Sequence, residues 1–264
     1  ENETIKAQMR AIIWYSAYRA INERFKKITG ETLKEGLTIL CLATIEFSPQ
    51  YGLALHIQDI EPTFTLGEMA KNKQAVIDKL KKEKLFDANK KTTLPMVPKR
   101  IAVISVETSK GYSDFMITLS KNNWNYKFEC QLFPSLLQGE KAITNMVERL
   151  AQIKEKIEDF DCVAIIRGGG GDVGLSCYDH YTLANEVARF PIPILTGIGH
   201  STNETVTEMV AFANKITPTA VAYFLIQQYH NFALLIEDYQ NSILTKASER
   251  IKNDFFILEK QNQI

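Results

Sequence analysis

The sequence predicts an α/β fold with a mostly parallel sheet and flanking helices, preceded by part of a small antiparallel β-barrel and followed by a long C-terminal helix. Short apolar runs alternate with amphipathic segments between residues 100 and 213, which is typical of parallel strands joined by helices. Upstream, two strand-like runs flank a turn that contains Pro and Gly, which indicates a β-hairpin. Downstream of residue 217, apolar residues recur at near-heptad spacing, as in a helix that packs against another helix.

The composition narrows the class of protein. Lysine plus arginine equal aspartate plus glutamate at 31 each, so the formal net charge is zero. This excludes a strongly basic coat for nucleic acid but leaves room for a local basic groove. No CxxC pair is present, which favours buried, reduced thiols over a zinc site or disulfides; the cysteines are Cys41, Cys130, Cys162 and Cys177. No apolar run is long enough to cross a bilayer and no signal peptide is visible, so we expect a cytoplasmic protein without membrane contact.

Residues 1–65 predict part of a small antiparallel barrel. After a short strand and a helix within residues 5–19, residues 37–47 and 53–60 form the expected hairpin around Ser48–Gly52. Small barrels of this kind stack the bases of single strands on aromatic rings, while nearby Lys and Arg bind phosphates. The alternative is that most of these rings belong to the core. The candidate stacking residues are Trp14, Phe47 and Tyr51.

Residues 66–96 predict a helical linker between two domains. The segment from Leu66 to Phe86 is amphipathic and rich in lysine. Its lysines most simply form a solvated face, and a DNA-facing role is the less favoured alternative. Pro95 and Pro98 then mark a stiff boundary before the next domain.

Residues 97–228 predict the α/β domain. Apolar runs mark the expected strands, which are residues 100–105, 127–133, 161–166 and 192–196. Helical spacing marks the expected helices, which are residues 112–122, 139–160, 182–189 and 205–213. One long helix is expected from residue 217 onward, and its part over residues 229–264 carries an apolar stripe that should pair with another helix. The stripe contains Ile236, Tyr239, Ile243, Ala247, Ile251, Phe255 and Leu258.

Two neighbouring strands end on residues suited to an anion. One strand ends on Arg167 and then on four glycines, Gly168, Gly169, Gly170 and Gly171; the next runs into Gly199 and His200. Glycine-rich backbone lets N–H groups approach an anion, Arg clamps a phosphate, and His transfers protons near neutral pH. A structural histidine is the less favoured alternative. The run matches neither a dinucleotide fingerprint nor a P-loop, which argues against a nucleotide- or cofactor-binding α/β enzyme.

Six segments carry a family resemblance, and they are QYGLALHIQDIEPTFTLGEMA, VISVETSKGYSDF, LFPSLLQG, RGGGG, TGIGHSTN and KITPTAVAYFLI. Together and in this order they resemble the large subunit of the exodeoxyribonuclease VII family. The resemblance implies an exonuclease subunit that hydrolyses phosphodiester bonds of single-stranded DNA to oligonucleotides, from either end. It implies no required cofactor, with a divalent metal compatible but not essential.

The same resemblance implies an organisation and partners. The family has an N-terminal OB-fold, an α/β catalytic domain, and a long coiled coil that carries copies of a small subunit. Here the barrel lacks its first strands and the last helix is short, so we expect a fragment that holds a partial OB-fold and the start of the coiled coil. The expected partners are the small subunit, single-stranded DNA and a second copy of the chain, in a homodimer through the C-terminal helix.

Three catalytic residues of the family match His200, Arg167 and Asp114. Arg167 and the loop amides would hold the scissile phosphate and stabilise its developing charge. His200 would act as general acid or base, and Asp114 would orient His200 or a water. On the residues alone, Asp114 is equally well explained as an aspartate near the start of a helix.

One departure from the family bears on activity. The family's GHETD reads GHSTN here, so Asn203 stands where an aspartate is regarded as catalytic. An amide can orient a water but cannot accept a proton as a carboxylate does. Either Glu204 or Glu208 supplies the missing acid, or this copy is a catalytically weakened single-strand-binding scaffold subunit. A third alternative is that Asn203 is an engineered substitution.

Overall fold

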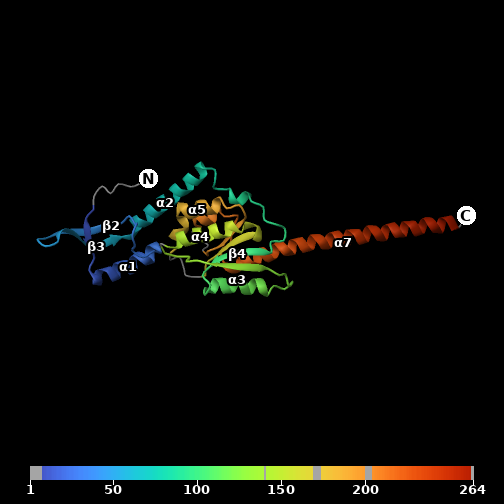
Figure 1. Ribbon diagram of the computed structural model, residues 1–264, viewed down its shortest axis with the longest axis horizontal. Coiled ribbons are helices and arrows are strands. Elements are labelled where there is room, and N and C mark those ends of the chain that lie inside the picture. Colours follow the sequence, from blue (N-terminus) through green and yellow to red (C-terminus); the bar gives the residue numbers. More distant parts are fainter. Residues whose placement is uncertain (1–7, 140, 169–173, 200–203, 263–264) are drawn as a thin grey trace.

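The computed structural model describes residues 8–139, 141–168, 174–199 and 204–262. Three parts follow one another along its long axis (Figure 1). A small sheet with one helix lies at one end, an α/β domain lies in the middle, and a single helix extends to the other end.

The N-terminal sheet has three strands in the order β1-β3-β2. They are β1 (Arg10–Ile12), β2 (Leu40–Ser48) and β3 (Gly52–Glu61). β2 and β3 pair antiparallel across the turn at Ser48–Gly52, which confirms the predicted hairpin. Helix α1 (Tyr15–Thr29) packs on this sheet and buries Phe25 against Ile60. The identity of this unit as a partial OB-fold stays a prediction.

Helix α2 (Pro62–Lys82) continues directly from β3 and leads to the α/β domain. Its proline stands in the first turn, where no backbone donor is needed, and the Glu61 carboxylate accepts a hydrogen bond from the N–H of Thr63 at 3.1 Å. This cap explains why the helix begins before Leu66, where the sequence predicted its start. Leu80 is fully buried in the core of the α/β domain.

The central sheet has five parallel strands in the order β5-β4-β6-β7-β8. They are β4 (Arg100–Ser105), β5 (Glu129–Pro134), β6 (Cys162–Ile166), β7 (Ile194–Gly197) and β8 (Ala213–Asn214). β5 is added on one side of β4, and the later strands are added on the other. The strand order therefore reverses between β4 and β6, and such a switch point opens a crevice at the carboxyl ends of the strands.

Helices cover both faces of the central sheet, which confirms the α/β prediction. The helices are α3 (Lys110–Ser120), α4 (Lys141–Glu155), α5 (Tyr181–Ala188), α6 (Val206–Val210) and α7 (Pro218–Asn262). α3 packs beside the first turns of α7 on one face, and the other three helices, together with α2, cover the other face. Because successive side chains of a strand point to opposite faces, Val103 of β4 enters one core and Ile104 enters the other.

Two predicted helices were too long. The helix predicted over residues 205–213 is wrong beyond Val210, because the chain there turns into β8. The buried side chain of Asn89 explains the change: its Oδ1 accepts the N–H of Phe212 at 2.9 Å and that of Ile194 in β7 at 3.0 Å, which ties the two segments together. The helix predicted over residues 139–160 ends at Glu155, and a 3₁₀ turn over Ile157–Asp159 replaces its last part.

Among the side chains of helix α7 whose burial is described, only those at its start are buried. It has 45 residues, and Val221 and Leu225 pack on the central sheet, whereas the rest extends away from the α/β domain (Figure 1). All members of the predicted stripe from Ile236 to Leu258 are exposed. Among the residues described, no helix is both long and apolar enough to cross a membrane.

The four cysteines are free thiols. Cys162 and Cys177 are buried, while Cys41 and Cys130 are half-buried. Burial raises the pKa of Cys130 and of Cys177 to about 12, so both stay protonated and unreactive at neutral pH.

Candidate functional site

Hydrogen bonds tie together the carboxyl ends of β4, β6 and β7 beside the switch point. Ser105, the last residue of β4, donates its hydroxyl to the main-chain oxygen of Ile166 at 2.7 Å. The N–H of Arg167 donates to the main-chain oxygen of Gly197 at 3.0 Å. These bonds fix the places where the chain leaves β6 and β7 toward the two segments predicted to bind and cleave a phosphate ester.

The first turn of α3 lies against the beginning of the glycine loop. Ser109 caps this helix by accepting the N–H of Tyr112 on its hydroxyl at 3.1 Å. A Cβ on Gly111 would lie 2.7 Å from the nitrogen of Gly168, and a Cβ on Gly168 would lie 2.7 Å from the nitrogen of Gly111. Two backbones therefore meet where neither residue can carry a side chain. The first N–H groups of a helix lack partners within it and carry partial positive charge, so this edge is suited to an anion.

Gly111 and the two serines that hold this junction, Ser105 and Ser109, are not among the predicted site residues. The signal was present in VISVETSKGY, where a strand runs into a Ser cap and a glycine follows inside the first helical turn. Glycine is a poor helix former, so its place there indicates a close backbone approach.

Asp114 lies on the same face of α3 as Gly111, because residues three apart on a helix are neighbours. Helical side chains lean toward the N-terminus of their helix, so we expect the Asp114 side chain to lie on the side of α3 that faces the junction with Gly168. The residue is half-buried, and its main-chain oxygen accepts the hydroxyl of Thr118 at 2.7 Å. This placement is compatible with the predicted role in orienting a reacting group.

Arg167 is buried, with 5% of its surface exposed. Burial raises the pKa of Cys177 and of Tyr178, and the nearby positive charge of Arg167 acts in the opposite direction on both. The guanidinium therefore lies close to the segment in which the chain rejoins the domain after the glycine loop. Its role as a phosphate ligand stays a prediction.

Several predicted site residues lie outside the described residues. These are Gly169, Gly170, Gly171, His200 and Asn203. The described residues just before His200 include two closely packed glycines. A Cβ on Gly197 would lie 2.7 Å from the Cγ2 of Val221 in α7, so this position has no room for a side chain. Gly199 has a positive φ of 83°, a conformation that favours glycine. The glycines of TGIGH thus bring β7 close beneath the start of α7.

Comparison with known proteins identifies the family. A family model described as exonuclease VII, large subunit, matches residues 85–263. The chain belongs to this family. A relative named exodeoxyribonuclease 7 large subunit, from Deinococcus radiodurans, is 30% identical over 245 residues, which cover 92% of this chain and 59% of that protein.

Relatives of the same name occur in other bacteria. The protein from Clostridium tetani is 30% identical over 195 residues, or 74% of this chain and 48% of the relative. The protein from Lacticaseibacillus casei is 33% identical over 200 residues, or 75% of this chain and 43% of the relative. The chain thus spans about half the length of the curated relatives it matches.

The two acids considered as substitutes for the family's aspartate differ in their surroundings. Glu208 is buried and caps α6: its Oε2 accepts the N–H of Thr205 at 2.7 Å and the hydroxyl of Thr205 at 2.8 Å. Burial raises the pKa of this carboxyl. Glu204 is exposed, and its Oε1 accepts the side-chain amide of Asn214 at 3.0 Å. Of the two, Glu204 has the carboxylate that is exposed to solvent.

The three candidate stacking rings of this exonuclease VII family member are on the surface. Trp14, Phe47 and Tyr51 are 64%, 72% and 65% exposed. Core packing therefore does not account for these three rings. The guanidinium of Arg10 lies over the ring of Tyr51, 5.6 Å from its centroid, which places a cation beside a ring as single-strand binding would require.

Among the described residues, no group of three or more His, Cys, Asp or Glu side chains is arranged to hold a metal ion.

Proposed function

We propose that this chain is the part of an exonuclease that hydrolyses phosphodiester bonds of single-stranded DNA. It releases oligonucleotides from either end, without a strict requirement for a divalent metal, in complex with the family's small subunit. The observation that carries the proposal is the junction of Gly111 with Gly168 at the switch point. It brings the positive end of α3 to the loop that begins at Arg167, within a family whose relatives bear the exodeoxyribonuclease name.

In the proposed reaction, the loop amides and Arg167 hold the scissile phosphate and stabilise the charge that develops on its oxygens. A water attacks phosphorus and loses a proton, and the bond to the leaving sugar oxygen breaks as that oxygen gains a proton. His200 supplies one of these proton transfers. Asp114, on the same face of α3 as Gly111, orients His200 or the water.

A second candidate function is a single-strand-binding scaffold with a weakened site. It is favoured by Asn203, together with the burial of Glu208 in the cap of α6. In this alternative, DNA binds the exposed rings of the N-terminal sheet, but no carboxylate replaces the missing aspartate.

Degradation of a labelled single strand separates the two functions. The complete gene product, assembled with the small subunit, would be compared with Asn203→Asp and His200→Ala, in EDTA and in magnesium, with a label at either end of the strand. Cleavage by the natural protein that His200→Ala abolishes supports the exonuclease. Cleavage only after Asn203→Asp supports the scaffold. Equal rates with and without His200 would exclude the proposed site.

The exposed stripe of α7 is the proposed site of assembly. Apolar residues from Ile236 to Leu258 stay in solvent along a helix that leaves the α/β domain, and a second helix would bury them. The small subunit is the first candidate for that helix, and a second copy of this chain, in a homodimer, is the other. Sedimentation of the chain with and without the small subunit, for the natural sequence and for Ile243→Lys, distinguishes the two.

A further inference from the structure

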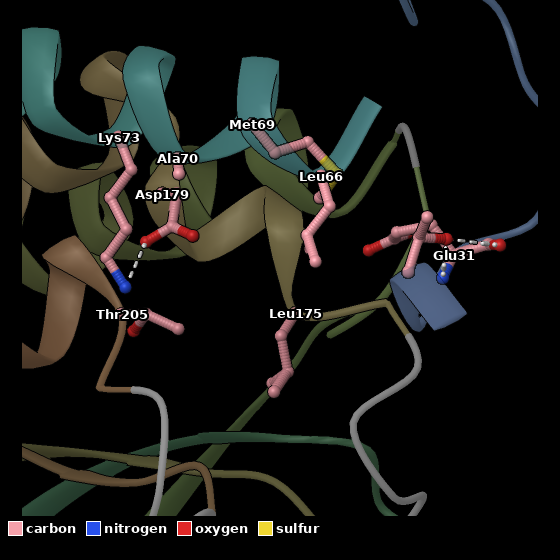
Figure 2. Close-up of a pocket in the computed structure, with 9 residues that line it drawn as sticks. Glu31, Leu66, Met69, Ala70, Lys73, Leu175, Asp179 and Thr205 are labelled. Carbon is pink, nitrogen blue, oxygen red and sulfur yellow. Dashed lines mark hydrogen bonds and ion pairs between the residues drawn. The ribbon is translucent and has the colours of Figure 1, made fainter. Parts of the chain in front are cut away.

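A cavity of about 360 Å³ lies at the seam between the N-terminal part and the α/β domain (Figure 2). α2 and the end of α1 line one side, and the α/β domain lines the other through Leu175, Asp179 and Thr205. Apolar side chains occupy the middle, and a polar contact stands toward each end: Lys73 at one and Glu31 at the other. Each of these contacts reaches a segment that follows one of the two site loops in sequence.

Lys73 of α2 holds the chain that follows β7. Its ammonium donates a hydrogen bond to the main-chain oxygen of Glu204 and lies 3.7 Å from Oδ1 of Asp179. The same Oδ1 accepts the N–H of Val206 at 2.8 Å. One lysine from the N-terminal side therefore connects residues 204–206 to Asp179, and both partners are largely shielded from water.

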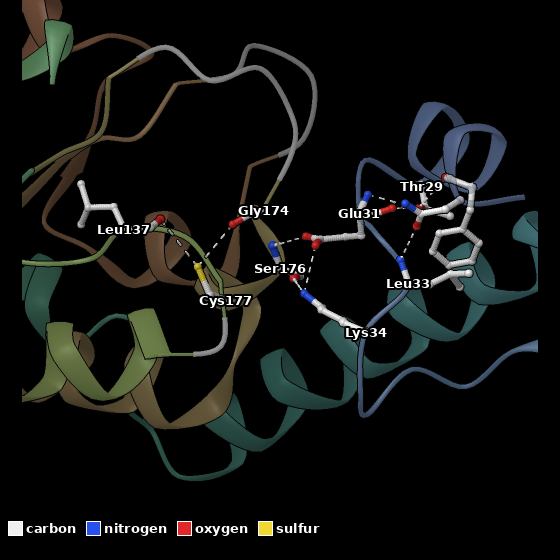
Figure 3. Close-up of polar contacts among 10 residues, drawn as sticks. Thr29, Glu31, Leu33, Lys34, Leu137, Gly174, Ser176 and Cys177 are labelled. Atoms are coloured by element: carbon white, nitrogen blue, oxygen red, sulfur yellow. Dashed lines mark hydrogen bonds and ion pairs between the residues drawn. The ribbon is translucent and has the colours of Figure 1, made fainter. Parts of the chain in front are cut away.

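Glu31 holds the chain that follows the glycine loop (Figure 3). Its Oε1 accepts the N–H of Ser176 at 3.2 Å, and its Oε2 accepts the ammonium of Lys34 at 2.9 Å. Lys34 also donates to the hydroxyl of Ser176 at 3.0 Å. Glu31 is buried, and an ion pair shielded from solvent is screened less by salt than a surface pair.

We propose that Lys73 and the Glu31–Lys34 pair are positioning residues for the nuclease site. From the N-terminal side, they hold the two described segments, 174–179 and 204–206, in which the chain returns to the α/β domain after Gly168 and after Gly199. Both contacts reach main-chain atoms, the oxygen of Glu204 and the nitrogen of Ser176, so they fix the path of the backbone. The proposal rests on the proposed function, because it assigns the loops between these points to catalysis.

Small displacements of a positioned group lower the rate of the chemical step more than they weaken substrate binding. Loss of a positioning residue should therefore lower kcat and leave KM nearly unchanged. A lysine that bound DNA phosphate would instead raise KM and the Kd for DNA. This split separates a positioning role from direct contact with the substrate.

The test compares three variants of the complete gene product assembled with its small subunit. Lys73→Met removes the ammonium and keeps the length of the side chain, while Lys73→Arg keeps a cation that can still donate to both partners. Lys71→Met is the matched control: Lys71 lies on the same helix but pairs with Glu68 in solvent, at 2.6 Å. We expect Lys73→Met to lower kcat about tenfold with KM and Kd for single-stranded DNA within about twofold, Lys73→Arg to recover most of kcat, and Lys71→Met to match the natural protein.

Hydrogen exchange of the main chain supplies a readout that needs no activity. In Lys73→Met, but not in Lys71→Met, the amides of residues 204–206 should exchange faster, and in Glu31→Met, which removes the acceptor of the Ser176 N–H, those of residues 174–179 should do so. Unchanged exchange in both variants would overturn the proposal, as would faster exchange with an unchanged kcat. If the natural protein cleaves no DNA, the proposed function fails, and the exchange data alone decide whether these contacts hold segments 174–179 and 204–206.

Discussion

The two sheets of this molecule differ in how far their side chains are buried. In β6 every residue is buried, and in β4 every residue after Arg100 is buried, whereas β2 of the N-terminal sheet contains no buried residue. A parallel sheet must be covered on both faces, while an antiparallel hairpin tolerates one face in water. The candidate site of the central sheet therefore lies at the carboxyl ends of its strands and not on its faces. The N-terminal sheet has exposed rings on its surface, where the single strand of the proposed function would lie.

The seam between these sheets differs from both, because charged side chains cross it at each end of an apolar middle. The small core under α1 and the two cores of the central sheet are apolar, but Lys73 and Glu31 cross the seam to main-chain atoms. Polar contacts with fixed geometry specify one relative placement of two surfaces better than apolar contact does. The seam is therefore suited to holding segments 174–179 and 204–206 in place.

The largest expected difference between the two regions is in the free energy of unfolding, when one phenylalanine ring is removed from each. Phe115 of α3 is fully buried, and Phe47 of β2 is 72% exposed. Phe115→Ala should lower the free energy of unfolding by about 3–5 kcal/mol, because it leaves a cavity between α3 and the sheet. Phe47→Ala should change it by less than about 0.5 kcal/mol. Urea unfolding followed by circular dichroism measures both, and equal losses would remove the distinction between the sheets.

The next effect concerns the junction at the carboxyl edge. Gly111→Ala places a Cβ against the backbone of Gly168, so we expect a loss of about 1–3 kcal/mol in unfolding free energy and a loss of DNA cleavage of about a hundredfold or more. Gly67→Ala is the control, since Gly67 lies within α2 with no atom within 4 Å of an added Cβ. It should raise stability by about 0.5–1 kcal/mol. Activity in Gly111→Ala equal to that of Gly67→Ala would contradict the assigned site.

A third comparison tests the open sheet as a DNA surface. Tyr51 in the hairpin turn and Tyr223 of α7 are both 65% exposed, so the two substitutions remove rings of similar exposure. Tyr51→Ala should raise the Kd for a single-stranded oligonucleotide about fivefold or more, because one stacked base is lost. Tyr223→Ala should leave it unchanged. Fluorescence anisotropy gives both values, and a matching rise in the two variants would indicate a nonspecific effect.

Much of the central domain could be predicted from the sequence, and the reason is local. β4 and β6 are continuous apolar runs between polar breaks, so each can be recognised from a few consecutive residues. β8 could not be predicted in this way. Its two residues lie beside β7 where Asn89, far away in sequence, accepts the main-chain N–H groups of Ile194 and Phe212.

The candidate site shows the same division between local and long-range information. Arg167 and Gly168 stand out in the sequence because they follow a strand directly. Gly111, Lys73 and Glu31 act through partners that are distant along the chain, so no spacing within their own segments predicts those contacts. Burial of Glu208 likewise depends on how α6 packs, which its neighbouring residues alone do not specify.

The smallest expected effect compares one carboxyl from each region. Burial raises the pKa of Glu208 above its ordinary 4.5, whereas the hydrogen bond from Arg24 lowers the pKa of Asp59 in β3 below 3.8. The ionised form of Glu208 is therefore disfavoured in the folded chain, and its penalty grows as pH rises above 4.5. The ionised form of Asp59 is favoured, and its contribution is lost as pH falls below 3.8.

Conservative amides should reveal these opposite signs. Glu208→Gln keeps an oxygen that can accept from Thr205, so the variant should gain stability relative to the natural protein as pH rises from 4 to 7, by less than about 1 kcal/mol. Asp59→Asn should lose relative stability as pH rises toward and through about 3.8, and should change little once Asp59 is ionised in both the folded and the unfolded chain. Urea midpoints measured at several pH values give both differences. If the stability difference from the natural protein changed with pH in the same direction for both variants, the two carboxyls would not have pKa values shifted in opposite directions.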